Sequence, residues 1–395
     1  MSFASAGMVG VNSGFEDDDG NLLDDAGTGI NAGIDWNNFA DVSWVQSATP
    51  ATPTRQADKT LSGWKFKGIE DWQATTADSG FAGGTKQDAD CPGVITAKAP
   101  NKDDLKRIYL ASKTVSVDVN PDENVTVLED HTFLNLAWVR IPQNTTSPSA
   151  HIGFEFNKAT KDTAPCGGTS PLVHRTVNDL LVVYDFEGGS TDVPTISLRK
   201  WVDSGTCEIA NNSPPCWGPA TNLTALGFAE AKVNTVGSVL DELSPPSSLA
   251  TGSSVDATLG TNEFGEAGID LTAAGVFDPD VCNSFGTAYA VSRSSGNSGT
   301  AQMKDLDGPA PFTLQNCGSV TIIKRTAPRD LNQNFSYTSN LVGTCTTDAT
   351  PAAFTLNDNG AGDTTSNTET CTDVPAGNYT VTEGSDPTGF VFTDL

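Results

Sequence analysis

Along much of the chain, every second residue is apolar and the residues between are polar or small. Ile152, Phe154 and Phe156 alternate with polar or small neighbours, and the same pattern recurs over Val182–Phe186 and Ile196–Leu198. Successive side chains of a strand point to opposite faces, so a period of two predicts half-buried strands. Gly, Asp, Asn and Pro clusters between these segments predict turns. The pattern therefore predicts an all-β protein.

One segment shows a different period. In Asn101–Ala111, residues Leu105, Ile108 and Tyr109 would share one face of a helix, and Asn101 is a favourable N-cap. We therefore expect one minor helix beside the strands.

The distribution of aromatic residues divides the chain. All seven tryptophans lie between Trp36 and Trp217, and a distinct small unit begins after Cys317. A chain of 395 residues is long enough for two or three domains. We predict a large, jelly-roll-like β-sandwich over residues 1–317 and a small β-sandwich over residues 318–395.

The cysteine pattern favours disulfides over metal ligation. The eight cysteines include no Cys-x-x-Cys pair, and only three histidines accompany them. Disulfides persist in oxidising compartments, so we expect an extracellular, secreted or cell-surface protein; reduced cytosolic thiols are the alternative. Eight cysteines allow 105 pairings, and their sequence neighbours favour Cys207–Cys216, Cys345–Cys371 and Cys282–Cys317, which leaves Cys91–Cys166.

Net charge excludes two classes of partner. The chain has 22 basic and 49 acidic side chains, a formal charge of −27. Such a polyanion repels nucleic acid and anionic lipid. No apolar run reaches the roughly 18 residues of a membrane helix, so we expect no membrane insertion within this chain.

The C-terminal segment resembles a known family. Val320-Thr-Ile-Ile-Lys324, Pro375-Ala-Gly-Asn-Tyr-Thr-Val-Thr-Glu383 and Pro387-Thr-Gly-Phe390 are similar to motifs of the prealbumin-like (Cna protein B-type) domains of bacterial surface proteins and pilins. The resemblance implies a seven-stranded β-sandwich. It also implies that the family's last strand, which carries an Asn or Asp, would follow Leu395.

In that family a lysine attacks the Asn or Asp of the last strand, and a glutamate shuttles the proton. The resemblance assigns these roles to Lys324 and Glu383, and the period of two places both on the apolar faces of their strands. An intramolecular isopeptide bond is one interpretation. The other is a lysine whose ammonium reaches water at a strand end, an exposed glutamate, and Cys345–Cys371 as the crosslink of this domain.

The first 317 residues resemble the domain that precedes prealbumin-like or immunoglobulin-like repeats in large secreted bacterial proteins. The similar segments include Gly83-Gly-Thr-Lys-Gln-Asp88, Phe264-Gly-Glu266 and Ser292–Asp305. The resemblance implies an adhesin or surface scaffold without a catalytic mechanism. Its ligand, on a host, a cell wall or a glycan, is not specified.

An acidic run near the N-terminus is a candidate calcium site. Asp17, Asp19, Asn21 and Asp24 gather oxygen ligands around a glycine turn, as calcium sites do. The twelfth position from Asp17 is Thr28 rather than a bidentate Glu, so the run departs from an EF-hand. A solvated acidic turn is the alternative; no other cofactor is predicted.

No arrangement of residues predicts an enzyme. Glycosidases need two carboxylates flanking the bond, yet Glu155 and Asp185 alternate with aromatics as an outward face would, and Glu263 and Glu266 are three residues apart. The sequence has no Gly-x-Ser-x-Gly and no His-Glu-x-x-His.

Two further sets of residues have both a binding and a structural interpretation. Gly83–Lys86 and Lys102–Asp104 either line a ligand groove or form a turn and a helix start. Trp36, Trp64 and Trp72 either stack on sugars or fill the core. The sequence thus favours a non-catalytic extracellular structural or adhesive protein. The alternative is a carbohydrate-binding, lectin-like module, with or without bound calcium.

Overall fold

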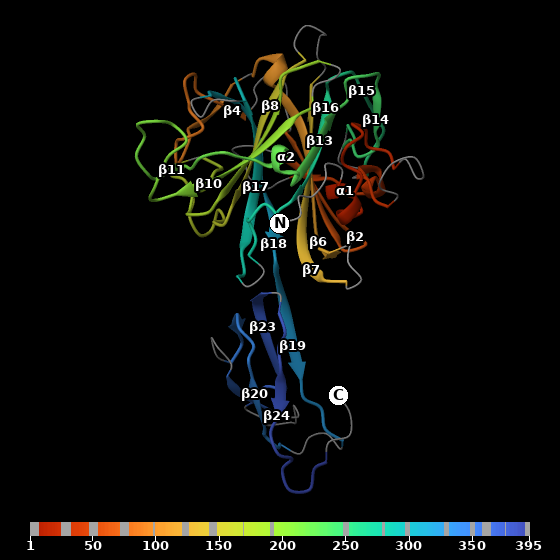
Figure 1. Cartoon of the computed structure of the whole chain (residues 1–395), viewed down its shortest axis with the longest axis vertical. Coiled ribbons are helices and arrows are strands. Elements are labelled where there is room, and N and C mark those ends of the chain that lie inside the picture. The colour runs from red at the N-terminus through yellow and green to blue at the C-terminus, as the bar shows by residue number, and fades with distance from the viewer. Residues whose placement is uncertain are drawn as a thin grey trace. The chain divides into compact units, whose positions relative to one another are not determined.

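The structure is a computed structural model, and it confirms an all-β protein built of antiparallel sheets in a sandwich-like arrangement (Figure 1). It describes residues 8–24, 33–46, 54–71, 79–97, 99–120, 126–141, 148–168, 170–189, 193–247, 253–278, 281–296, 301–327, 332–347, 352–357, 365–375 and 377–391. The chain divides into two compact units, each of which is described by itself.

The elements of the large unit are α1 (Met8–Ser13), η1 (Trp36–Phe39), β1 (Val45–Gln46), β2 (Thr54–Leu61), β3 (Trp64–Asp71), β4 (Ser79–Phe81), β5 (Val94–Thr96), η2 (Asn101–Asp103), β6 (Leu105–Asp118), β7 (Leu128–Arg140), β8 (Ala150–Asn157), β9 (Leu180–Phe186), β10 (Thr195–Val202), β11 (Cys216–Trp217), β12 (Thr221–Asn222), α2 (Leu223–Leu226), β13 (Ala229–Val233), β14 (Val239–Asp241), β15 (Ala257–Leu259), β16 (Phe264–Asp270), β17 (Ser284–Arg293) and β18 (Met303–Gln315). The small unit adds β19 (Cys317–Ile323), β20 (Phe335–Ser339), β21 (Thr344–Cys345), β22 (Ala353–Leu356), β23 (Thr368–Pro375) and β24 (Val381–Glu383). No helix in the described ranges is long and apolar enough to cross a membrane.

Two large sheets form the large unit. The seven-stranded sheet has the order β1-β2-β3-β6-β7-β16-β13, and the nine-stranded sheet runs β11-β10-β9-β8-β17-β18-β4-β5, with β12 on β10. Trp138 of β7 meets Tyr184 of β9 edge-on, with ring centroids 5.7 Å apart. The inner faces of the two sheets therefore pack against each other to form one core.

The other face of the seven-stranded sheet is also covered. The N-terminal segment, residues 8–24 and 33–46, packs Phe15, Trp36 and Phe39 on that face, where the rings of Phe39 and Phe66 stack 4.8 Å apart and the ring of Trp36 lies 6.0 Å from that of Tyr109. This sheet is therefore buried on both sides, and the N-terminal segment acts as a third layer.

The predicted helix over Asn101–Ala111 is wrong. Only a 3-10 turn, η2, forms at Asn101–Asp103, and the fourteen-residue strand β6 follows from Leu105. Residues Ile108 to Ala111 are all fully buried, two on each face of a central strand. A continuous apolar run of this kind fits a covered strand as well as a helical face, because periodicity alone does not distinguish them.

The small unit contains two three-stranded sheets, β19-β23-β21 and β22-β20-β24. Phe335, Tyr337, Phe354 and Leu356 form one of its apolar clusters. The unit begins at Gln315, three residues before the predicted boundary, and it also takes in residues 277–284.

All four predicted disulfides form: Cys91–Cys166, Cys207–Cys216, Cys282–Cys317 and Cys345–Cys371. No cysteine is left free. Four disulfide pairs indicate an oxidising, extracellular environment.

Candidate functional site

The outer face of the seven-stranded sheet presents acidic and amide side chains beneath the N-terminal segment. Glu266 and Gly268 lie two residues apart on β16 and share this face. In the register, Gly268 is opposite Glu230 of β13 and Asn135 of β7. Opposite residues point to the same side, so two carboxyls and an amide face the segment that carries the acidic run.

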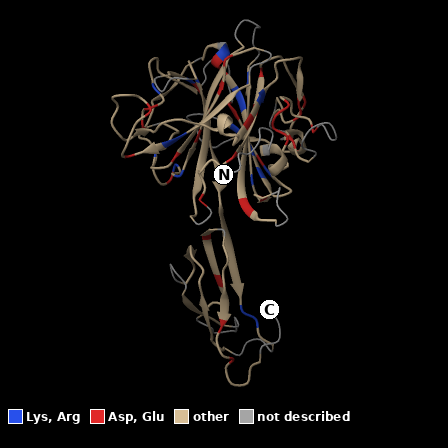
Figure 2. Ribbon diagram, in the orientation of Figure 1, with Lys and Arg blue, Asp and Glu red and all other residues tan. Residues whose placement is uncertain are grey.

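Two hydrogen bonds join the N-terminal segment to Glu266. The backbone N–H of Gly20 donates to Oε1 at 2.8 Å, and the indole Nε1 of Trp36 donates to Oε2 at 2.9 Å. Figure 2 shows acidic positions in this segment. The glutamate thereby orients the turn that contains Asp17 and Asp19.

Asp17 is fully buried, and neither of its carboxylate oxygens has a hydrogen-bond partner among the described residues. A Cβ atom at Gly268 would lie 1.7 Å from its Oδ2 and 2.8 Å from Oδ1 of Asn135. The two oxygens therefore face the same small space beside Gly268. Asn135 is also fully buried, and its amide has no partner among the described residues.

Asp35 brings another buried carboxylate to this place. It caps η1, and its Oδ1 accepts the N–H of Trp36 at 2.5 Å, whereas its Oδ2 has no partner in the described part of the chain. One oxygen of Asp24 is likewise buried without a partner there.

Burial raises the pKa of the carboxyls of Asp17, Asp35 and Glu266 well above the usual range. The negative charge of Asp19 raises the pKa of all three carboxyls further, and the charge of Asp35 also raises the pKa of Glu266. The charge of Asp19 is common to all three, whereas the largest charge effects on Asp17 come from Glu230 and Asp18. We call Asp17, Asp19, Asp35 and Glu266 the carboxylate cluster.

The predicted calcium ligands fall partly in this cluster. Asp17 and Asp19 belong to it, and the negative charge of Asp24 raises the pKa of Asp35. Asn21 does not extend into it, because its Nδ2 donates to Asp19 and its Oδ1 accepts the N–H of Leu23 at 2.7 Å. Thr28 lies outside the described residues.

Sequence reasoning missed Asp35, Glu266 and Asn135 as members of this site. One clue was present, because a glycine in a strand interior often marks the close approach of another group. Gly268 fills that role, and it identifies the sheet face on which Glu266 lies.

In the small unit, Lys324 and Glu383 lie in contact. Nζ of Lys324 lies 2.5 Å from Oε1 of Glu383, and it lies 3.9 Å from the ring centroid of Phe335. Glu383 is opposite Tyr337 in the β20–β24 pair. Burial raises the pKa of Tyr337, and the charge of Glu383 adds to the effect. The side chains of Lys324 and Glu383 are 15% and 21% exposed, so the pair lies at the edge of the core.

Glu155 and Asp185 were expected on an outward face, and both are buried. Nε of Arg175 lies 2.7 Å from Oε1 of Glu155, and Asp185 lies 3.3 Å from the ring nitrogen of His151. The prediction is wrong because loops cover the outer face of β8 and β9. Glu155 is held by an arginine and is not a reactive acid in an open groove.

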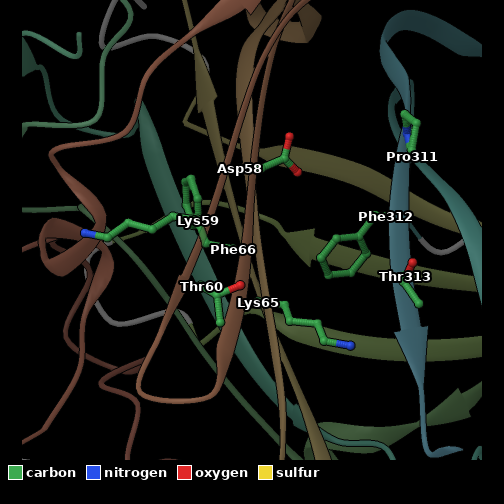
Figure 3. Close-up of a pocket in the computed structure, with 8 residues that line it drawn as sticks. All are labelled: Asp58, Lys59, Thr60, Lys65, Phe66, Pro311, Phe312 and Thr313. Atoms are coloured by element: carbon green, nitrogen blue, oxygen red, sulfur yellow. The ribbon is translucent and has the colours of Figure 1, made fainter. Parts of the chain in front are cut away.

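A pocket of about 470 Å³ lies between β2, β3 and β18 (Figure 3). Asp58, Lys65 and Phe312 approach one another across it, whereas Lys59 extends to the other side. Asp58 is the one carboxylate among the described residues that line it, and it pairs with Lys67 at 3.0 Å. Among the described residues, no tryptophan and no second acid lines this pocket.

The other candidate binding residues have structural surroundings. Trp36 and Trp64 are buried in the core, and Trp72 lies outside the described residues. Lys102 and Asp103 line a cavity of only about 10 Å³, and Asp104 is buried. In Gly83–Lys86, Thr85 closes a turn onto the carbonyl of Ala82 at 3.0 Å.

Comparisons with known proteins found no counterpart. No family model, no curated protein and no solved structure matches this chain.

Proposed function

We propose that this protein is an extracellular structural or adhesive protein of a bacterial cell surface, without catalytic activity. The observation that carries the proposal is the crosslinking of the β-units by four disulfides. Such crosslinks limit the entropy of the unfolded chain. They suit a module that must persist outside the cell.

The small unit supports a load-bearing role in particular. Cys282–Cys317 joins segment 277–284 to the first strand of this unit, and Cys345–Cys371 joins β21 to β23. A force applied along β19 would have to break the ladder of hydrogen bonds between β19 and β23. The covalent links on both sides of that ladder would limit how far the unit extends.

The ionisable groups of the large unit support a non-catalytic role. Arg107 pairs with Asp241 at 2.6 Å, and Arg175 pairs with Glu155. Both pairs are buried within the fold. In the described part of the chain, the open pocket between β2, β3 and β18 has one carboxylate, Asp58, which pairs with Lys67.

The proposal is tested by locating the protein and assaying adhesion. Protease treatment of intact producing cells should remove the protein, and the purified chain should bind immobilised cell-wall, extracellular-matrix or glycan surfaces without cleaving them. Recovery solely from the cytosol, with all eight thiols alkylatable before reduction, would contradict the proposal.

Carbohydrate binding is the second candidate, and the pocket between β2, β3 and β18 favours it because Phe312 and several polar groups converge there. A glycan array with wild type and Lys65→Ala tests it. Binding that the substitution weakens at least tenfold would place a sugar in this pocket, whereas no bound glycan would remove this candidate.

Lys324 and Glu383 lead to a separate proposal for the small unit. By the resemblance, the Lys324 amine would attack the side-chain carbonyl of an Asn or Asp on a following strand. The new amide would release ammonia or water, with Glu383 taking and returning the proton. The protein is then expected to be lighter by one ammonia or water in intact-mass spectrometry, and Glu383→Gln should restore the full mass. An unshifted wild-type mass would exclude the bond.

A further inference from the structure

We propose that the Cys91–Cys166 disulfide is a redox-active site that exchanges with small thiols, with His174 as its acid–base group and Asp90 as the residue that positions the imidazole. This inference goes beyond the structural and adhesive role. It assigns a reaction to one of the four disulfides, whereas the other three act as crosslinks.

His174 lies beside both sulfur atoms of this disulfide. Its Nδ1 is 3.2 Å from Sγ of Cys91, and a ring nitrogen and the two sulfurs all lie within 4.8 Å of one another. Nδ1 is also 2.8 Å from Oδ2 of Asp90. Sulfur, imidazole and carboxylate therefore form one chain of contacts, and a histidine in such a chain can exchange protons with a thiol and stabilise a thiolate.

The backbone fixes this arrangement. Two hydrogen bonds of 2.8 and 3.0 Å join segments 164–166 and 172–174, which places the buried cysteine and the histidine on the two arms of one hairpin. Oδ1 of Asp90 accepts the backbone N–H of Arg175 at 2.9 Å. The residue that precedes Cys91 is thus tied to the residue that follows the histidine, and the ring is held against the sulfur.

An external thiol can reach one of the two sulfurs. The side chain of His174 is 51% exposed, and Cys91 is partly exposed, whereas Cys166 is buried. Attack is therefore expected at Cys91, with Cys166 as the leaving group. The reacting thiol approaches on the side of the disulfide where the imidazole is open to water.

The exchange step balances without a further reactant. The imidazole of His174 takes the proton of the incoming thiol, and the resulting thiolate forms a bond to Sγ of Cys91. The bond between Cys91 and Cys166 breaks, its electron pair goes to Sγ of Cys166, and the proton returns from the imidazole to that thiolate. The products are a mixed disulfide at Cys91 and a free thiol at Cys166. A second thiol can then release the symmetrical disulfide and leave both cysteines reduced.

The other disulfides have different surroundings. In the described part of the chain, the carboxylate of Asp373 lies beside Cys282–Cys317, and that of Glu369 lies beside Cys345–Cys371. A carboxylate disfavours a nearby thiolate by repulsion between like charges, whereas an imidazolium stabilises it. Both sulfurs of Cys207–Cys216 belong to buried residues, so this pair is shielded from external thiols.

The charged side chains next to the site are held in contacts of their own. Arg175 pairs with Glu155, Asp88 accepts a backbone N–H at 3.1 Å, and Lys161 donates to a backbone carbonyl. The group that changes its charge during the exchange is therefore His174.

Exchange with 2-mercaptoethanol tests the site on the full chain. After brief exposure at pH 7, N-ethylmaleimide blocks the freed thiols, and peptide mass mapping shows which pair has opened. Cys91–Cys166 should open about tenfold faster than Cys282–Cys317, the matched control that has a carboxylate in place of the imidazole. The first peptides to change should carry mercaptoethanol on Cys91 and the maleimide on Cys166.

Variants of the histidine and its carboxylate separate the chemistry from mere accessibility. His174→Gln keeps a polar side chain and should slow the opening of Cys91–Cys166 about tenfold at pH 7, where the reagent must lose its proton. Asp90→Asn should slow it as well, because Asp90 stabilises the charged ring. At about pH 9.5 the reagent supplies its own thiolate, so both variants should approach the wild-type rate. Cys282–Cys317 should open at the wild-type rate in both variants.

Two results would overturn the proposal. If Cys91–Cys166 opens no faster than Cys282–Cys317, it is a crosslink like the others. If wild type and His174→Gln open this pair equally fast at pH 7, the exposure of Cys91 governs the reaction and the imidazole has no part in it. Neither result changes the adhesion and localisation assays, so the proposed function is judged separately.

Discussion

His131 on β7 shows how a single residue couples stability to pH. Its ring Nδ1 lies 2.6 Å from Oδ2 of Asp270 on the neighbouring strand β16. This hydrogen bond raises the pKa of His131, and the negative charges of Asp270 and Glu129 raise it further because they attract the protonated ring. A histidine whose pKa is higher in the folded state stabilises the protein fully below the unfolded-state pKa of about 6.5. That contribution is lost as pH rises through the raised pKa.

We therefore predict that His131→Gln costs about 1 kcal/mol at pH 5.5 and much less at pH 9. Urea unfolding of wild type and variant across this range gives the difference directly. A constant difference across the range would mean that His131 does not change its charge in the way its contacts indicate.

Gly268 is a second residue with a measurable role. A Cβ there would overlap Oδ2 of Asp17, so Gly268→Ala should displace the buried carboxylate and destabilise the protein by about 1–3 kcal/mol. Gly93→Ala is the control, because a Cβ at Gly93 meets nothing within 4 Å. Equal effects of the two substitutions on the unfolding free energy would contradict the prediction.

Among the elements, β6 shows where sequence reasoning reaches its limit. The sequence of β8 alternates aromatic with small or polar residues, so this strand was predicted correctly although loops also cover its outer face. Strand β6 lies in the centre of a sheet with a layer on each side, so its apolar residues do not alternate. The third layer that produces this burial is the N-terminal segment, and its docking could not be inferred from local periodicity.

The same cause limits prediction of the candidate site. Three disulfides were predicted from their sequence neighbours, and Cys91–Cys166 was predicted because it was the pair that remained. Glu266 and Asp35 belong to the carboxylate cluster only because β16 lies beneath the N-terminal segment. That contact joins residues more than two hundred positions apart, as in the Trp36–Glu266 bond with a separation of 230.

The ion pair between strands β6 and β14 leads to a prediction about stability. Arg107 of β6 is fully buried, and it pairs with the fully buried Asp241 of β14 at 2.6 Å. Asp241→Ala would leave the buried guanidinium without this partner, so we expect a loss of about 3–5 kcal/mol. Asp41→Ala, which breaks the ion pair of Lys59 with an 81% exposed Asp41, should cost less than about 1 kcal/mol. Chemical denaturation of both variants compares the two values, and a similar loss in each would be inconsistent with this assignment.

For the whole molecule, the two units should unfold separately. The small unit has two modest apolar clusters, so its stability depends strongly on its covalent links. We predict that Cys345→Ser/Cys371→Ser lowers the stability of this unit by about 2–4 kcal/mol and leaves the transition of the large unit in place. Calorimetry resolves the two transitions. The control Cys207→Ser/Cys216→Ser should shift only the transition of the large unit, and movement of both transitions by either variant would mean that the units are not independent.

The anchoring of the N-terminal segment to β16 has a consequence for the order of folding. The bond between Gly20 and Glu266 spans 246 residues, and contacts of such separation form slowly because a long loop must be closed first. The face that receives the segment exists only after β16 has paired with β7. The N-terminal segment therefore leaves the ribosome long before β16 but reaches its final position after it, and until then the outer face of the central sheet is open to the surrounding water.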